Sequence, residues 1–218
     1  MNPHLNQPSL HTGASLEDCQ GVVLMMHGRG GSPDDMLALA KRLNLPSLAY
    51  FAPAAAGASW YPTRFMEPRE SNEPYLSYAL EAYDQRVRDV LAKGIPVENI
   101  ALLGFSQGAC LTAEYAFRHP ARYGGVIIFT GALIGPTGTI WNATGGNATG
   151  GFDNTPIFLG SSDIDDWVPL SRVQETSAVF RRMGATVSER IYASMAHLVC
   201  DDEISAARTI LQGMRLHP

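Results

Sequence analysis

Short apolar runs alternate with longer amphipathic stretches along most of this chain. Several of the runs, such as 21–26 and 125–129, are continuous, which is typical of strands that are buried on both faces of a sheet. The stretches between them repeat apolar residues at helical spacing. We predict strands at 21–26, 47–52, 99–103, 125–129, 156–160 and 186–192, and helices at 33–43, 75–93, 109–117, 170–183 and 201–214. This alternation predicts an α/β fold with a mostly parallel central sheet and helices on both faces.

Local signals support several of these elements. Ser32 precedes Pro33, and Asp35 follows at the third helical position, which is a strong helix start. The helix from residue 75 carries its apolar stripe at Leu76, Leu80, Tyr83, Val87, Val90 and Leu91. Gly94 follows that helix and is expected to end it.

Length and composition predict a single domain over 1–218. A chain of 218 residues with 45% hydrophobic and 17% charged residues can bury a large core. Residues 1–18 are polar and read as a lead-in that contributes an edge strand. The segment 136–154 holds a direct repeat of Asn-Ala-Thr-Gly-Gly, and we expect a mobile surface loop there without assigned chemistry.

Charge and cysteine content exclude several classes of protein. A net charge of −5 gives no basic surface for nucleic acid. The three cysteines are widely spaced and fit a reducing compartment rather than a disulfide framework or a zinc site. The N-terminal stretch does not resemble a signal peptide, and no apolar run is long enough to span a membrane. We therefore expect a cytoplasmic protein with no metal, no cofactor and no membrane insertion.

A serine stands at the sharpest predicted turn. The strand ending at Leu103 leads into Gly104-Phe-Ser-Gln-Gly108, and a helix follows directly. Gly104 and Gly108 lack the Cβ that would collide where strand and helix approach each other. This pattern is typical of a nucleophile elbow, in which Ser106 faces the N-terminus of a helix. A glycine-rich turn with an idle serine is the competing interpretation.

A serine nucleophile needs a base, and the base needs an acid that orients it. Among the six histidines, only His197 lies in a loop after a strand and downstream of the candidate acids, so we predict that it is the general base. Asp163, Asp165 and Asp166 follow an earlier strand, and spacing alone does not decide among them. The chain order Ser, Asp, His is the order that accompanies an elbow of this kind.

Two backbone donors are predicted to bind the oxyanion that the reaction would form. One is the N–H of Gln107, next to the nucleophile. The other is the N–H of Arg29, in the glycine-rich segment 27–31 after the first buried strand. We interpret the Arg29 side chain as a brace of its loop through an acidic neighbour, with a substrate carboxylate as the alternative ligand.

Aromatic residues mark a candidate substrate pocket. Trp60, Tyr61 and Phe65 lie in the Gly- and Pro-rich stretch 54–73, and Trp167 follows the aspartate cluster. As pocket walls they would favour short to medium apolar acyl groups. A loop that packs its own aromatic side chains is an equal alternative for this stretch.

Five motifs together resemble the phospholipase/carboxylesterase family of α/β-hydrolases, which includes acyl-protein thioesterases and small bacterial carboxylesterases. They are His-Gly-Arg-Gly-Gly at 27–31, Trp-Tyr-Pro at 60–62, Gly-Phe-Ser-Gln-Gly at 104–108, Asp-x-x-Val-Pro at 165–169 and Met-x-His at 195–197. The resemblance covers nearly all of 22–211 and implies the α/β-hydrolase fold. It also implies that Asp165 orients His197, the base of the Ser106 nucleophile.

The chain departs from the family pattern at three places. Ala196 stands where members commonly have glycine, Asp166 replaces the usual proline, and 136–154 looks like an insertion. These departures bear on loop conformation and substrate preference rather than on the reaction. We therefore expect a serine carboxylesterase that hydrolyses short- to medium-chain carboxylic esters through an acyl-enzyme.

Two alternatives stay open. One is a lysophospholipase or acyl-protein thioesterase that acts on long-chain acyl groups. The other is a binding protein that uses the hydrolase fold without catalysis, which would require a displaced triad or a blocked elbow. The expected partner is a small-molecule ester or thioester. The sequence also leaves room for a homodimer.

Overall fold

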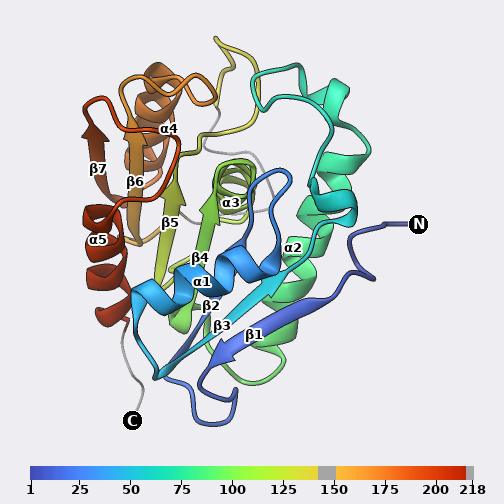
Figure 1. Cartoon of the computed structure of the whole chain (residues 1–218), viewed down its shortest axis with the longest axis vertical. Coiled ribbons are helices and arrows are strands. Elements are labelled where there is room, and N and C mark those ends of the chain that lie inside the picture. The colour runs from blue at the N-terminus through green and yellow to red at the C-terminus, as the bar shows by residue number, and fades with distance from the viewer. Residues whose placement is uncertain (142–150, 215–218) are drawn as a thin grey trace.

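The computed structural model describes residues 1–141 and 151–214, and these contain a seven-stranded sheet (Figure 1). The strands lie in the order β1-β3-β2-β4-β5-β6-β7. Their bounds are β1 Ser9–Gly13, β2 Gly21–Met26, β3 Leu48–Pro53, β4 Ile100–Phe105, β5 Gly125–Phe129, β6 Pro156–Ser162 and β7 Thr186–Tyr192. Only the edge strand β1 runs antiparallel to its neighbour among these strands, so the expected mostly parallel sheet is confirmed.

Helices cover both faces of the sheet (Figure 1). Val22, Leu24 and Met26 of β2 pack in one apolar core with α2 (Tyr75–Leu91), α3 (Gln107–Arg118) and α4 (Leu170–Arg182). Val23 and Met25 point to the other face and pack with α1 (Pro33–Leu43) and α5 (Asp201–Gln212). The alternation of side chains along a strand thus explains why the run in β2 is apolar throughout.

Helix α1 begins as the sequence predicts, whereas one residue of the predicted apolar stripe in α2 is not buried. Ser32 Oγ accepts the N–H of Asp35, and the Asp35 carboxylate accepts the N–H of Ser32, so α1 begins with a capping box. Leu91 was expected in the buried stripe of α2 but is 41% exposed. Successive helical residues are rotated by about 100°, and Val90 already occupies the inward position.

The stretch between β3 and α2 contains two short 3-10 turns, Ala56–Ala58 and Arg69–Asn72, where no element was predicted. The expected edge strand of the lead-in is β1. Residues 142–150, which hold most of the repeat within the expected 136–154 insertion, lie outside the described residues.

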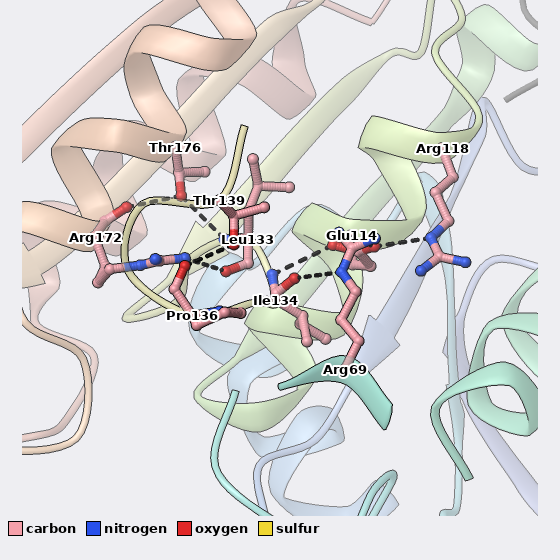
Figure 2. Close-up of polar contacts among 9 residues, drawn as sticks. All are labelled: Arg69, Glu114, Arg118, Leu133, Ile134, Pro136, Thr139, Arg172 and Thr176. Atoms are coloured by element: carbon pink, nitrogen blue, oxygen red, sulfur yellow. Dashed lines mark hydrogen bonds and ion pairs between the residues drawn. The ribbon is translucent and has the colours of Figure 1, made fainter. Parts of the chain in front are cut away.

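A buried carboxylate ties three segments together (Figure 2). Glu114 of α3 is fully buried and contacts the guanidinium groups of Arg69 at 2.9 Å and Arg118 at 2.8 Å. Its second oxygen accepts the N–H of Ile134 at 3.3 Å. Arg69 belongs to the stretch between β3 and α2, and Ile134 to the segment after β5. One side chain therefore holds both segments against α3.

The segment after β5 is also held from α4 (Figure 2). Arg172 donates to the carbonyl oxygen of Leu133 at 2.9 Å, and Thr176 Oγ1 accepts the N–H of Leu133 at 3.0 Å. Gly135 N–H donates to the carbonyl oxygen of Phe65 at 2.8 Å. The Arg172 guanidinium lies 5.7 Å from the centre of the Phe65 ring. These contacts fix the position of Phe65 relative to α3 and α4.

Glu203 of α5 is a buried carboxyl group. Its Oε2 accepts the N–H of Cys200 at 2.8 Å, which caps the helix, while Oε1 has no hydrogen-bond partner among the described residues. Burial raises the pKa of Glu203 to about 7. The folded state therefore binds this proton more tightly than the unfolded chain does.

This linkage predicts how stability depends on pH. Because the folded pKa of about 7 lies above the ordinary value of 4.5, the contribution of Glu203 is fully present below pH 4.5 and is lost as the pH rises through 7. Glu203→Gln should therefore raise the free energy of unfolding at pH 8, by up to about 3 kcal/mol, and change it little at pH 4.5. Urea unfolding at both pH values measures this, with Glu17→Gln at an exposed position as the control. An equal shift at both pH values would contradict the linkage.

Candidate active site

Ser106 joins β4 to α3 in a strained backbone conformation. Its φ of 54° and ψ of −119° lie outside the regions that residues with a Cβ favour. Close packing enforces this turn. A Cβ at Gly104 would meet the carbonyl oxygen of Gly108, and a Cβ at Gly108 would meet the carbonyl oxygen of Met26. The predicted strand–turn–helix is therefore present, and small residues are required on both sides of the serine.

Three side chains from separate segments converge at the carboxyl edge of the sheet. His197 Nε2 lies 2.9 Å from Ser106 Oγ, and His197 Nδ1 lies 2.7 Å from Asp165 Oδ2. A carboxylate oxygen only accepts, so Nδ1 carries the hydrogen and Nε2 is left to accept the Ser106 O–H. This arrangement can transfer the hydroxyl proton to the imidazole ring. The Asp165 side chain is fully buried, whereas His197 remains 24% exposed.

Asp165 is fixed by its own loop, between β6 and α4. Its Oδ1 accepts the N–H of Trp167 at 2.8 Å and that of Val168 at 2.9 Å, which leaves Oδ2 for His197. Asp163 instead accepts the N–H of Ser194 at 2.7 Å. Among the aspartates of this cluster, Asp165 is the one that the structure brings to the histidine.

The two predicted oxyanion donors lie beside Ser106. Arg29 and Gln107 line the same cavity as the serine. Within the described part of the chain, neither backbone N–H donates to another protein group. Gln107 is the first residue of α3, so its N–H belongs to the positive end of the helix dipole.

The Arg29 side chain braces its loop, although not through an acidic neighbour as expected. Its guanidinium donates to Ser59 Oγ at 3.0 Å and to the carbonyl oxygens of Pro62 at 2.9 Å and Thr63 at 2.6 Å. The segment 59–63 turns these oxygens toward the arginine, and they accept three hydrogen bonds from the guanidinium without a carboxylate.

A cavity of about 710 Å³ opens beside Ser106. Tyr61, Phe65 and Trp167 line it, as the sequence led us to expect. Trp60 is a correction, because it is only 1% exposed and does not line the cavity. Its indole packs behind the wall and donates to the carbonyl oxygen of His27 at 2.9 Å.

Phe105, Cys110 and Val168 are among the wall residues that sequence reasoning missed. Phe105 precedes the serine and packs its ring 5.2 Å from the ring of His197. Cys110 lies one helical turn after Ser106, so helical spacing alone was a usable signal. Burial raises the pKa of the Cys110 thiol to about 12, so this cysteine stays protonated at neutral pH and does not compete as a nucleophile.

Residues 1–141 and 151–214 contain neither a metal site nor a membrane-spanning helix. No group of His, Cys, Asp and Glu side chains there is arranged to hold a metal ion. None of the helices there is both long and apolar enough to cross a bilayer.

The sequence is similar to those of known hydrolases. The family model described as Phospholipase/Carboxylesterase matches residues 12–214. Acyl-protein thioesterase 1 of Saccharomyces cerevisiae is 25% identical over 89% of this chain and 93% of that protein. A probable carboxylesterase of Arabidopsis thaliana, SOBER1-like, is 29% identical over 52% of this chain and 42% of its own length.

Solved structures of related proteins are also similar to this chain. The phospholipase/carboxylesterase of Dyadobacter fermentans superposes with a TM-score of 0.89 at 40% identity, over 97% of this chain and 99% of that chain. Esterase PE8, at 22% identity and a TM-score of 0.78 over 96% and 98% of the two chains, shares the fold. The chain therefore belongs to the phospholipase/carboxylesterase family of α/β-hydrolases, and it is a serine hydrolase that acts on esters or thioesters.

Proposed function

We propose that this protein is a serine carboxylesterase in which Ser106, His197 and Asp165 form the catalytic triad. The observation that carries the proposal is the continuous hydrogen-bonded line from Asp165 through His197 to Ser106. The strained serine turn at the start of α3 supports it, because the same geometry exposes Oγ and places backbone donors beside it.

The reaction follows from these positions. Ser106 Oγ bonds to the acyl carbon while its proton moves to His197 Nε2, and the carbonyl π electrons pass to the oxygen. The N–H groups of Arg29 and Gln107 bind that oxyanion. When the intermediate collapses, the alkoxide leaves with the proton from Nε2. Water then attacks the acyl-enzyme by the same route, and Asp165 stabilises the imidazolium in both steps.

The cavity supports short to medium apolar acyl groups. Tyr61, Phe65 and Val168 are buried residues of its wall, and they present apolar surface beside Ser106. Burial raises the pKa of the Tyr61 hydroxyl well above its usual range, so this side chain stays uncharged. Buried apolar side chains beside the nucleophile favour the acyl part of a substrate over a charged group.

Hydrolysis of long-chain thioesters is a second candidate. Several relatives are named acyl-protein thioesterase 1, and Trp167 is exposed at the cavity, where it offers apolar surface to a longer chain. A panel of p-nitrophenyl esters from acetate to palmitate, each with its matched thioester, separates the two. A maximum of kcat/KM at short esters supports the carboxylesterase, and a maximum at long thioesters supports the thioesterase.

A fluorophosphonate probe tests the triad directly. The probe phosphonylates an activated serine and loses fluoride, so we expect one label per chain, located on Ser106 by peptide mass analysis. Heat-unfolded protein is the control and should remain unlabelled, because activation requires His197 in place. A label on another residue, or none on folded protein, would contradict the assignment of the nucleophile.

A further inference from the structure

We infer that His27 is a positioning residue that fixes the oxyanion hole, an inference that rests on the function proposed above. His27 directly follows β2 and is buried. Its Nδ1 lies 2.7 Å from the carbonyl oxygen of Gly28, and its Nε2 lies 3.0 Å from the backbone nitrogen of Ala55. Both ring nitrogens are therefore hydrogen-bonded to backbone groups.

These two contacts determine the tautomer of the ring. The carbonyl oxygen of Gly28 only accepts, so Nδ1 carries the hydrogen. The N–H of Ala55 only donates, so Nε2 is unprotonated. Burial lowers the pKa of His27, which keeps the ring neutral. The neutral tautomer with hydrogen on Nδ1 satisfies both contacts at once.

The contact to Gly28 acts on the proposed donor through one peptide unit. The carbonyl of Gly28 and the N–H of Arg29 belong to the same planar peptide, which is trans. Gly31 N–H also donates to this carbonyl, at 3.0 Å. With the carbonyl held by two donors, the Arg29 N–H is held in the opposite direction. A glycine-rich segment needs such a restraint, because glycine allows a wider range of φ and ψ and so more orientations of the peptide plane.

Trp60 links the neighbouring His27–Gly28 peptide to the residue that carries the second donor. Its indole Nε1 donates to the carbonyl oxygen of His27 at 2.9 Å, and its ring packs 5.1 Å from the imidazole. Its backbone N–H donates to Gln107 Oε1 at 2.9 Å. The segment that carries Arg29 and the first residue of α3 are thus joined through one buried tryptophan. This role explains why Trp60 lies behind the cavity wall.

Two substitutions separate the contacts of His27. In His27→Asn the amide nitrogen is as far along the side chain as Nδ1, so the donor to Gly28 is kept and the acceptor for Ala55 is lost. In His27→Gln the amide oxygen reaches the position of Nε2, so the acceptor is kept and the donor to Gly28 is lost. We expect His27→Gln to lower kcat by about 10- to 100-fold, less than the loss of an oxyanion donor itself. KM should change little, because the oxyanion exists only in the transition state.

A tetrahedral adduct supplies a second readout. A trifluoromethyl ketone places an oxyanion in the hole when Ser106 adds to it, so its inhibition constant should weaken in His27→Gln by the same factor as kcat. His27→Asn should stay within about threefold of wild type in both quantities, because the restraint on the donor peptide is kept.

His4 provides the matched control. It is also buried, it accepts the N–H of Ala56 at 3.1 Å, and it packs 5.5 Å from Trp60, but it does not contact the Gly28–Arg29 peptide. His4→Gln should therefore keep the wild-type kcat. Equal losses in His27→Asn and His27→Gln, or an equal loss in His4→Gln, would overturn the inference.

Ser106→Ala, measured in parallel, distinguishes this inference from the proposed function. If Ser106→Ala retains turnover, the proposed function is overturned. If Ser106→Ala is inactive but His27→Gln is fully active, only the role of His27 is overturned. Should His27→Gln fail to fold, Trp60→Phe tests the same restraint one peptide earlier, because it removes the donor to the His27 carbonyl and keeps a ring. A matched few-fold loss of kcat and ketone affinity supports the inference, and no change overturns it.

Discussion

Ser106→Ala is expected to lower kcat for p-nitrophenyl butyrate by about 10⁴-fold or more. The substitution removes the oxygen that we propose bonds to the acyl carbon, so no acyl-enzyme should form. His197 and the donors of Arg29 and Gln107 remain, so a small rate above that of water should persist. Initial rates measure the loss, and stopped-flow traces should show no burst of p-nitrophenol.

The fold is expected to survive this substitution, so the loss can be assigned to chemistry. Alanine keeps the Cβ that Ser106 already carries at φ 54°, so the strain of the turn is unchanged. The Oγ atom of Ser106 contacts His197, which is partly exposed. In the variant, water should take the position of Oγ beside the imidazole. A melting temperature close to that of wild type is the control. Turnover close to wild type would place the nucleophile elsewhere.

Much of this fold and site was predictable because it depends on local patterns. Continuous apolar runs identify buried strands without knowledge of their neighbours, as in β2. Gly104 and Gly108 flank the serine because the turn allows no Cβ at either position. The five-residue motif at 104–108 shows that constraint in the sequence. The choice of Asp165 among the neighbouring aspartates was not visible in spacing. It came from the family resemblance, and the Oδ1 contacts to Trp167 and Val168 now give it a physical reason.

The residues that sequence reasoning misplaced depend on contacts between distant loops. Trp60 was expected in the cavity wall because aromatic residues commonly line substrate pockets. Its true place is set by the carbonyl of His27, which lies far away along the chain. No role was predicted for His27, because the general base was expected downstream of the candidate aspartates in the chain. No local sequence pattern indicates that both ring nitrogens of a histidine are hydrogen-bonded to backbone groups.

Asp165→Asn is expected to lower kcat by about 10³- to 10⁴-fold, through the tautomer of His197. Two N–H donors, from Trp167 and Val168, meet the Oδ1 atom. An asparagine must present its carbonyl oxygen to those donors, so its NH₂ group faces His197 Nδ1. That nitrogen then has to accept, and the ring hydrogen moves to Nε2. A histidine with hydrogen on Nε2 donates to Ser106 and is unable to take its proton.

The size of this loss separates Asp165 from the acids beside it. Asp163→Asn removes a charge from the same loop and keeps an oxygen for the N–H of Ser194, and Asp163 does not contact His197. Its kcat should stay within about threefold of wild type, since a surface charge alone contributes little. Fluorophosphonate labelling should slow in Asp165→Asn as kcat does, because both reactions need the same activated serine. If Asp163→Asn lost as much activity, or Asp165→Asn lost less than about tenfold, the acid that orients the base would have to be sought elsewhere in this loop.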